Sequence, residues 1–280
     1  MVLRPPDSSA FIAEKRRNRA LDNALTRLNH SSAQTVITTH INADFDALAS
    51  LLAAQKLYPE ARVVFPGAQE KNLRNFFISS MVYLFNMTDI HSIDLDQVRR
   101  LVLVDTRHIG RIGKLAELVG RPDVEIHIYD HHPASDNDIH GSLEVCESTG
   151  ANVTILIEAI RARGVSISPD EATIMCLGLY EDTGSFTYAS TTERDFLAAA
   201  FLLSRGANLN VVSDLIAREL NPDQVALLND MIQAAVRSNV NGVEVVMTSI
   251  ALETYVPDFA FLVQKMAKME NLDVIFALAL

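Results

Sequence analysis

The sequence predicts an α/β fold in which a parallel β-sheet is flanked by helices, followed by a helical segment and the start of a second α/β domain. Two observations predict the sheet. Between residues 35 and 150, short runs of β-branched residues alternate with helical patterns, and this alternation is typical of a parallel sheet. The apolar runs are continuous along the chain, which is typical of strands that are buried on both faces.

The elements follow in order along the chain. Residues 1–34 are expected to form an N-terminal extension with a helix, whose basic cluster Lys15–Arg19 we interpret as a solvated helix face, with RNA contact as the alternative. Residues 35–240 are expected to form the main domain. Its predicted strands lie at 36–38, 63–65, 101–104 and 124–129, and its predicted helices lie at 48–57, 112–119, 151–163, 169–180, 192–204, 208–219 and 222–238.

Helix starts and the end of the chain carry further signals. Asn152 or Ser148 is expected to cap the helix at 151, and Ser168–Glu171 is a strong start signal for the next helix. Residues 241–280 begin with a turn and an alternating strand and stop in an apolar run. We expect them to be the incomplete start of a second domain whose C-terminal continuation is missing, and an uncovered apolar run favours a homo-oligomer.

Composition limits the function. The 280 residues include 24 Lys and Arg against 35 Asp and Glu, a formal net charge of −11. This balance argues against non-specific binding of duplex DNA, although metal ions could supply positive charge at a local phosphate site. The two cysteines are too few for a disulfide framework, and no apolar run has the length of a signal peptide or a membrane span. We expect a cytoplasmic protein with no membrane partner.

Acidic and imidazole side chains recur where the predicted strands end. The first strand runs into His40–Asp46, a later one into Asp105–Arg107, and another into Asp130–His132. The carboxyl ends of parallel strands face one crevice, where ligands bind. Hard oxygen ligands with some imidazole suit Mn²⁺ or Mg²⁺. Together with Asp182, these residues predict a site for two divalent cations, which needs several carboxylates.

Taken singly, these residues have simpler interpretations. His40 fits a structural histidine at a strand end, Asp46 fits the first turn of its own helix, and Asp105 and Asp182 fit turns. As one cluster without cations, the carboxylates would repel one another, which favours ligands. The isolated histidines are interpreted as structural, and the role of one histidine near Asp105 is not assigned. The isolated ones are His30, His91, His127 and His140, and the open one is His108.

Four motifs follow one another in order: His40-x-Asn42-x-Asp44-x-Asp46, Asp105-Thr106, Asp130-His131-His132 and Asp182-Thr183-Gly184-x-Phe186. This set resembles the DHH phosphoesterases, which are named for the Asp-His-His triplet, over about residues 35–240. The local sequence around the first motif is most similar to the amino-terminal DHH region of large bacterial proteins. In those proteins, CBS domains and a poly(A) polymerase- or tRNA nucleotidyltransferase-like region follow. Ala43 stands where members often have Pro, and the Gly-rich, His-containing motif of the family's second (DHHA1) domain would lie beyond Leu280.

The resemblance implies a role for each matching residue. The implied metal ligands are His40, Asp44 and Asp105 for one ion, and Asp46, Asp105, His131 and Asp182 for the other. Asp105 would bridge the two Mn²⁺ or Mg²⁺ ions, His132 would face the scissile phosphate, and Asp130 would orient a histidine. Further candidate substrate contacts are Asn42, Arg107 and Arg111, with surface ion pairs as the alternative for the two arginines.

The function implied by the resemblance is metal-dependent hydrolysis of phosphodiester or phosphomonoester bonds. The expected substrates are small nucleotides or short single strands of RNA or DNA. Two alternatives stay open. The chain could be an inorganic pyrophosphatase with the same cations, or a non-catalytic nucleotide-sensing module of a larger tRNA nucleotidyltransferase- or poly(A) polymerase-like protein.

Overall fold

The computed structural model describes residues 34–67, 84–216, 220, 222–251 and 259–279. The predicted N-terminal helix and its basic cluster lie outside these residues, as does His30. The contacts divide the chain into two compact units between Ile216 and Ala217. Among the described residues, no helix has the length and apolar character that crossing a membrane requires.

The first unit is built on a five-stranded sheet with the order β2-β1-β3-β4-β5. Its strands are β1 (Gln34–Thr38), β2 (Arg62–Val64), β3 (Val98–Val104), β4 (Glu125–Asp130) and β5 (Leu143–Cys146). Every neighbouring pair runs parallel, which confirms the predicted fold class. The chain leaves β1 toward β2 on one side and returns to β3 on the other. The carboxyl ends of β1 and β3 therefore flank a topological switch point, where open α/β sheets bind ligands.

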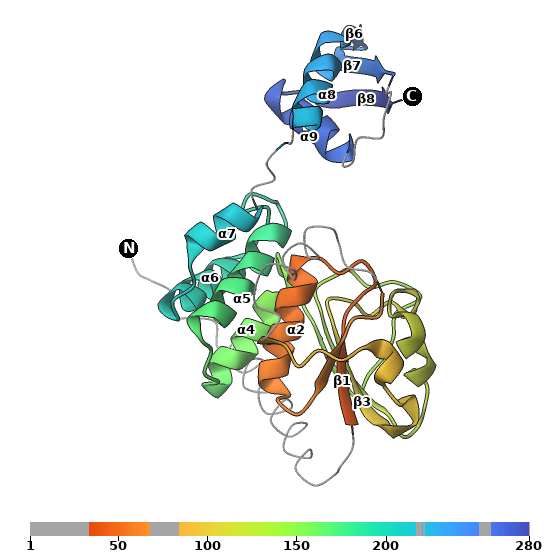
Figure 1. Ribbon diagram of the computed structural model, residues 1–280, viewed down its shortest axis with the longest axis vertical. Helices are drawn as coiled ribbons and strands as arrows, with labels where there is room; N and C mark the ends of the chain where they lie inside the picture. Colours follow the sequence, from red (N-terminus) through yellow and green to blue (C-terminus); the bar gives the residue numbers. More distant parts are fainter. Residues whose placement is uncertain (1–33, 68–83, 217–219, 221, 252–258, 280) are drawn as a thin grey trace, which may run out of the picture. The chain divides into compact units, whose positions relative to one another are not determined.

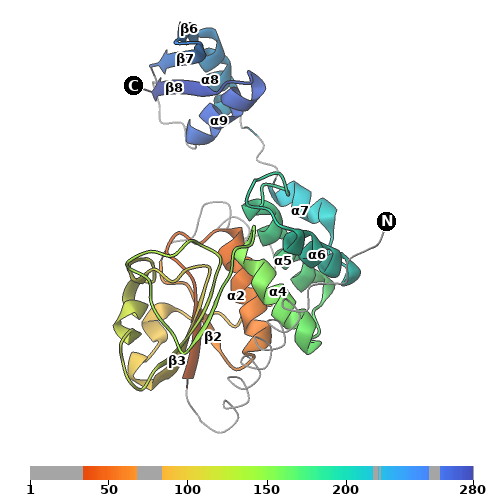
Figure 2. The same cartoon turned by 180° about the vertical axis from the view of Figure 1, so that it is seen from behind.

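Helices cover one face of this sheet (Figures 1 and 2). The helices next to the sheet are α2 (Phe45–Leu57) and α4 (Asn152–Arg163), and α5 (Pro169–Asp182), α6 (Glu193–Ser204) and α7 (Leu209–Ile216) pack on the helical layer. Helix α2 contacts β1 and β3, and α4 contacts β4. Side chains on this face, such as Ile37, Val102 and Tyr129, are buried in one core with the helices, whereas Val36 and Leu101 point into a second core on the opposite face.

The second face is covered differently from the prediction. In place of an α-helix at 112–119, the chain forms two 3-10 helices, η5 (Ile109–Arg111) and η6 (Gly113–Leu118), and two further ones, η3 (Ile90–Ser92) and η4 (Leu95–Gln97), precede β3. Ile112, Leu115 and Leu118 are fully buried, and their spacing of three residues matches the 3-10 period. Strand β5 was not predicted, because its sequence, Leu-Glu-Val-Cys, is not a continuous run of β-branched residues.

Helix α5 begins as the sequence predicts. The Ser168 hydroxyl accepts a hydrogen bond from Glu171 N at 3.3 Å, and the Glu171 carboxylate accepts one from Ser168 N at 2.7 Å, which is a capping box. The expected caps of α4 were wrong. Its N-cap residue is Ala151, which has no polar side chain, and Asn152 instead donates its side-chain amide to Ser50 Oγ at 2.9 Å. A carboxylate that is distant in the sequence accepts the hydrogen bonds from the N-terminus of this helix.

Helices α2 and α5 pack closely because Gly178 has no side chain. A Cβ atom there would lie 2.5 Å from Ala49 Cβ and 2.8 Å from Phe45 O, distances that force neighbouring atoms to move. The Glu181 carboxylate also accepts a hydrogen bond from Phe45 N at 2.7 Å. This crossing brings the first turn of α2 next to the last turn of α5, and so Asp46 near Asp182.

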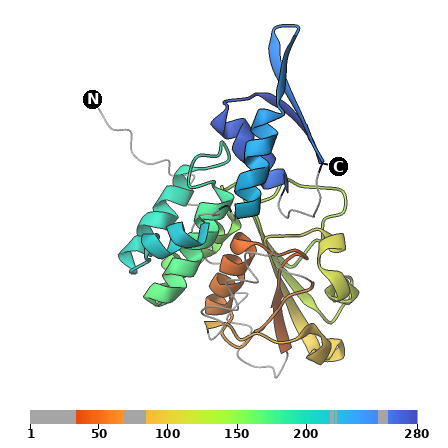
Figure 3. The same ribbon diagram turned by 45° about the horizontal axis from the view of Figure 1, so that its top comes forward.

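The second unit has a three-stranded sheet with the order β6-β7-β8. Its elements are α8 (Pro222–Gln233), β6 (Val236–Val240), β7 (Val243–Ile250), α9 (Phe259–Met269) and β8 (Val274–Ala279). In Figure 3 the hairpin of β6 and β7, in lighter blue, extends beyond the two helices of the same unit. Strand β6 runs antiparallel to β7, and β8 runs parallel to it.

Residues 222–240 differ from the prediction. The helix expected over 222–238 ends at Gln233, and residues 236–240 form β6. Asn241 and Gly242 both have positive φ, 53° and 89°, as a tight two-residue hairpin requires. Helix α8 packs against α9 and β7. Although the sequence interpretation included α8 and β6 in residues 35–240, both elements therefore belong to the second unit.

His127 on β4 has buried structural partners. It is 2% exposed, and its Nδ1 lies 2.8 Å from the hydroxyl of Tyr58, which lies 2.9 Å from the hydroxyl of Tyr129. Burial, assisted by the positive charge of Arg100, lowers the pKa of His127 to about 4. The folded protein therefore keeps this ring neutral at pH values where the unfolded chain protonates it.

We expect His127 to make the protein less stable in mild acid. Its contribution is complete above pH 6.5 and is lost as the pH falls toward 4, because only the unfolded state binds the proton there. Between pH 7 and pH 5 the loss is about 2 kcal/mol. Urea unfolding should show the stability difference between wild type and His127→Gln shrinking by about this amount at pH 5. An equal difference at both pH values contradicts the prediction, and exposed His140→Gln is the control.

Candidate metal centre

The predicted polar clusters meet at the carboxyl end of the sheet in the first unit. The segment 39–46 follows β1, Asp105 follows β3, and His131 and His132 follow β4, while Asp182 is the last residue of α5. Three groups of acidic and imidazole side chains lie here with all their ligand atoms within 4.8 Å of one another. Four segments far apart in the sequence therefore contribute to one cluster.

The first group consists of His40, Asp44 and Asp105. His40 Nε2 lies 3.2 Å from Asp105 Oδ2 and 3.8 Å from Asp44 Oδ2. His40 Nδ1 lies 2.8 Å from the carbonyl oxygen of Ile41. A carbonyl can only accept, so Nδ1 carries the proton and Nε2 is left to face the carboxylates. This is the tautomer that a metal ligand at Nε2 needs.

Asp44 serves two purposes at once. Its Oδ1 accepts a hydrogen bond from Ala47 N at 2.9 Å, which caps α2. The other oxygen, Oδ2, points toward His40. The cap fixes the carboxylate, so that its second oxygen has a defined position in the group.

The second group consists of Asp46, His131 and Asp182. His131 Nε2 lies 3.3 Å from Asp182 Oδ2 and 3.5 Å from Asp105 Oδ1. Its Nδ1 lies 3.0 Å from the carbonyl oxygen of Thr149. As at His40, a backbone carbonyl holds the Nδ1 proton and leaves Nε2 free for a metal ion.

Asp46 provides the carboxylate that accepts hydrogen bonds at the N-terminus of α4. It is buried, and its two oxygens accept hydrogen bonds from Asn152 N at 2.6 Å and Val153 N at 3.0 Å. The partial positive charge of a helix N-terminus favours a carboxylate there. The simpler alternative that the sequence left open linked Asp46 to the first turn of its own helix, whereas the structure also links it to the start of a helix more than one hundred residues away.

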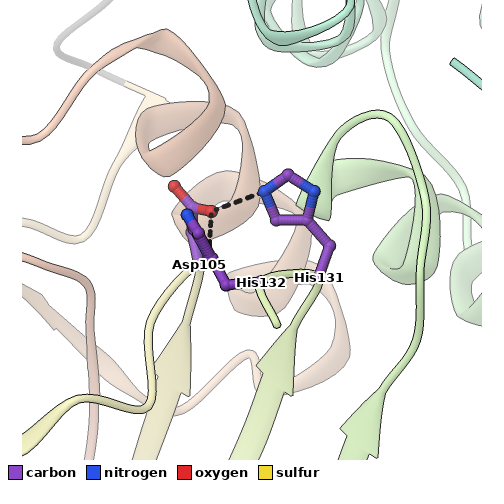
Figure 4. Close-up of side chains that lie close together, drawn as sticks. All are labelled: Asp105, His131 and His132. Carbon is purple, nitrogen blue, oxygen red and sulfur yellow. Dashed lines mark ion pairs between the residues drawn. The ribbon is translucent and has the colours of Figure 1, made fainter. Parts of the chain in front are cut away.

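Asp105 joins the two groups. Its Oδ1 lies 3.5 Å from His131 Nε2 and 3.8 Å from His132 Nδ1 (Figure 4), and its Oδ2 lies 3.2 Å from His40 Nε2. Asp105 has a φ of 58°, a left-handed conformation that aspartate tolerates better than most residues. It is 3% exposed, and its Oδ1 is buried without a hydrogen-bond partner.

The chemistry of these residues fits a pair of divalent cations. Four carboxylates and two correctly oriented imidazoles supply hard oxygen and nitrogen donors. The buried Asp105 Oδ1 is poorly paired, because the nearer imidazole nitrogen, His131 Nε2, lies 3.5 Å away. A buried carboxylate oxygen in this state is costly unless something binds it. Four negative charges would balance two divalent cations.

The electrostatics of the residues alone point the same way. Burial opposes the charged form of His131, but hydrogen bonding and charge from Asp105 and Asp46 outweigh it and raise its pKa to about 10. Burial likewise raises the pKa of Asp182 to about 6, with Asp105 adding to the effect. Burial and the neighbouring carboxylates also raise the pKa of Asp46. Protons thus offset part of the negative charge in the metal-free protein, a task that cations can perform instead.

His132 is held differently from the other two histidines. Its Nδ1 lies 2.8 Å from Asp130 Oδ1, which also accepts a hydrogen bond from His132 N at 3.3 Å. With Asp105 and His131, His132 forms the third group, whose ligand atoms lie within 4.8 Å of one another. Because Asp130 occupies Nδ1, His132 has only Nε2 left, and the side chain is 43% exposed. This arrangement suits contact with a substrate better than metal binding.

The two candidate arginines have different surroundings. Arg107 Nε lies 2.7 Å from Asp138 Oδ2, and its Nη2 donates to His132 O at 3.0 Å. Arg107 therefore fits the ion-pair interpretation and supports the His132 loop. Arg111 lines a pocket beside His132. Asn42 is exposed, with a φ of 60°, so the turn itself favours asparagine there.

Several supporting residues were not singled out from the sequence. Asp195 is fully buried, and its Oδ2 accepts a hydrogen bond from Gly150 N at 2.9 Å. Gly150 adjoins Thr149, whose carbonyl holds His131. The only sequence signal at Asp195 was a capping pattern with Thr192, which does not reveal a link to the centre.

Fold and centre together define an α/β protein with a candidate two-cation site at the switch point of a parallel sheet. The profile of the DHH family, N-terminal domain, matches residues 34–179. The chain belongs to the DHH family, which confirms the resemblance of the four motifs.

Individual relatives agree with this assignment. An A-adding tRNA nucleotidyltransferase of Geobacter sulfurreducens is 48% identical over 86% of this chain, which spans only 27% of that protein's length. A bifunctional oligoribonuclease and PAP phosphatase NrnA of Mycoplasma genitalium is 29% identical over 64% of this chain and 55% of its own length. A solved exopolyphosphatase-related protein of Bacteroides fragilis, 17% identical, shares the fold with a TM-score of 0.72 over 91% of this chain and 77% of its own.

Proposed function

We propose that this chain is a two-metal phosphoesterase that hydrolyses phosphodiester or phosphomonoester bonds of short oligonucleotides or small nucleotides. The observation that carries the proposal is the buried Asp105 carboxylate, which lies within reach of two separate groups of ligand atoms. The proposed ligands of the two Mn²⁺ or Mg²⁺ ions are His40, Asp44 and Asp105, and Asp46, Asp105, His131 and Asp182.

Each part of the centre has a proposed task. When bound, two divalent cations supply a deprotonated water at neutral pH and neutralise charge on phosphate oxygens. His132 contacts the scissile phosphate through Nε2, because Asp130 holds its Nδ1. Arg107 holds the backbone of His132 in place. Catalysis of this kind depends mainly on charge stabilisation by groups that are already positioned.

The relatives support this proposal and a second one. The Mycoplasma protein is named for hydrolysis of oligoribonucleotides and PAP. The Geobacter protein is named as an A-adding tRNA nucleotidyltransferase, so a nucleotide-sensing module of such a protein is the second candidate. In either case we propose that the first unit, from residue 35 onward, forms the DHH domain and that the second unit, which includes residues 241–280 and also α8 and β6, begins a DHHA1-like domain.

A hydrolysis panel with Mn²⁺ tests the proposal. The substrates are a 5′-phosphorylated diribonucleotide, a cyclic dinucleotide, adenosine 3′,5′-bisphosphate and pyrophosphate. We expect turnover of at least one nucleotide, abolished by EDTA and restored by Mn²⁺. Turnover of pyrophosphate alone would indicate a pyrophosphatase. Nucleotide binding without any turnover would favour the sensing module and contradict the proposed hydrolysis.

A further inference from the structure

A pocket of about 220 Å³ adjoins the candidate metal centre. It shares His132 and Asp130 with the centre, and its other walls come from the segments that follow β3 and β4. Since His132 lies beside Asp105 (Figure 4), the pocket is next to the position proposed for the scissile phosphate.

Backbone hydrogen bonds hold the walls of the pocket. Ile139 N donates to Arg107 O at 2.7 Å, and His108 pairs with Asp138 in an antiparallel bridge. Ile41 N, in the loop that follows β1, donates to Arg111 O at 2.7 Å. The three loops that carry the centre and the pocket are thus tied together, so a ligand would find the pocket formed in advance.

The two arginines of the pocket equal its two carboxylates in number, but only one of the arginines is paired with them. Of its two carboxylates, Asp138 pairs with Arg107 Nε at 2.7 Å, and Asp130 holds His132 Nδ1 at 2.8 Å. Within the part of the chain that the structure describes, the guanidinium of Arg111 has no hydrogen bond or ion pair to another side chain. Arginine presents five N–H donors that match the geometry of a phosphate.

His108 adds a second donor to the pocket. Its Nδ1 accepts a hydrogen bond from Gly110 N at 3.1 Å. An accepting nitrogen carries no proton in the neutral ring, so the proton is on Nε2. Nε2–H is therefore available to donate to an anion in the pocket that His108 and Arg111 both line.

We propose that this pocket binds a second phosphate group of the substrate, next to the one that is cleaved, through Arg111 and His108. This inference rests on the proposed hydrolase function and narrows its substrates to nucleotides with more than one phosphate. Short oligonucleotides and nucleoside bisphosphates belong to this class. A simple phosphate monoester leaves the pocket empty.

Steady-state kinetics with Mn²⁺ compare two substrates in the full chain. Adenosine 3′,5′-bisphosphate has the second phosphate, and p-nitrophenyl phosphate lacks it. We expect Arg111→Gln to raise the ratio of their KM values about tenfold, the effect of one lost charge-assisted hydrogen bond. His108→Ala should raise it by a smaller factor, and Arg111→Lys should recover part of the loss. Arg161→Gln, an exposed arginine in the last turn of α4, is the matched control.

A binding measurement keeps this test independent of catalysis. In EDTA, calorimetry should show Arg111→Gln binding adenosine 3′,5′-bisphosphate about tenfold more weakly than wild type and Arg161→Gln. Equal KM changes for both substrates, or unchanged binding in EDTA, would overturn the inference. If wild type cleaves no substrate, the proposed hydrolase function fails, whereas the binding comparison still decides whether this pocket holds a phosphate.

Discussion

Replacement of Asp105 by Asn should lower kcat/KM for the preferred nucleotide at least about a thousand-fold. A thousand-fold loss corresponds to about 4 kcal/mol of transition-state stabilisation, which is within the several kcal/mol that bound cations contribute. Asp105 is expected to have this effect because it touches both groups of ligand atoms, His40 on one side and His131 on the other. Asparagine keeps the shape and tolerates the φ of 58° at this position, so the fold should be retained.

Two measurements check this expectation. Calorimetric titration of the metal-free protein with Mn²⁺ should show two bound ions in wild type and weaker, incomplete binding in Asp105→Asn. Asp44→Asn removes a carboxylate from one group only. It should therefore weaken Mn²⁺ binding less than Asp105→Asn does. Exposed Asp136→Asn is the control for a lost surface charge. Turnover near the wild-type rate in Asp105→Asn would refute the proposed centre.

Replacement of Asp195 by Ala should destabilise the protein by about 3–5 kcal/mol, because four donors, two of them buried and two half-buried, lose their acceptor. These donors are Gly150 N, Thr192 N and the hydroxyls of Thr192 and Thr154, at 2.6–2.9 Å. Burial favours the neutral acid, but these hydrogen bonds outweigh it and lower the pKa of Asp195. The side chain is therefore an ionised carboxylate that joins α6 to the loop before α4.

The same substitution should weaken Mn²⁺ binding about 10- to 100-fold, the range seen when residues that orient a metal ligand are removed. The reason is that Gly150 adjoins Thr149, the residue whose carbonyl orients His131. Urea unfolding and Mn²⁺ titration measure the two effects. Should Asp195→Ala fail to fold, Thr154→Val, which removes one donor, should still cost about 1 kcal/mol. A change below about 0.5 kcal/mol in both variants, as expected for exposed Asp136→Ala, would contradict this role.

Much of the fold could be predicted because its signals are local. The β-branched runs of β1, β3 and β4 are continuous in the sequence, and the capping box of α5 lies within four residues. The errors arose where local signals are weak or shared. A spacing of three residues in Ile112–Leu118 fits both helix types, and the last turn predicted for α8 became β6, because pairing with β7 outweighed helical periodicity.

Much of the candidate centre could also be predicted, because metal ligands impose residue types that stand out at strand ends. The partners that orient those ligands could not. Ile41 and Thr149 act through backbone carbonyls, which every residue has. Arg107 showed its charge in the sequence, but not its ion pair with Asp138.

The sequence by itself determined the parallel α/β class, the order of the four motifs and the donor atoms they offer, since these depend on residue type and short-range spacing. Only the tertiary structure decided which carboxylate meets which histidine, which nitrogen of each ring faces the centre, and which arginine pairs with a carboxylate beside it. Those outcomes depend on contacts between residues up to 136 positions apart, such as Phe45 with Glu181. No local pattern specifies such contacts, because they form only when whole helices and strands pack together.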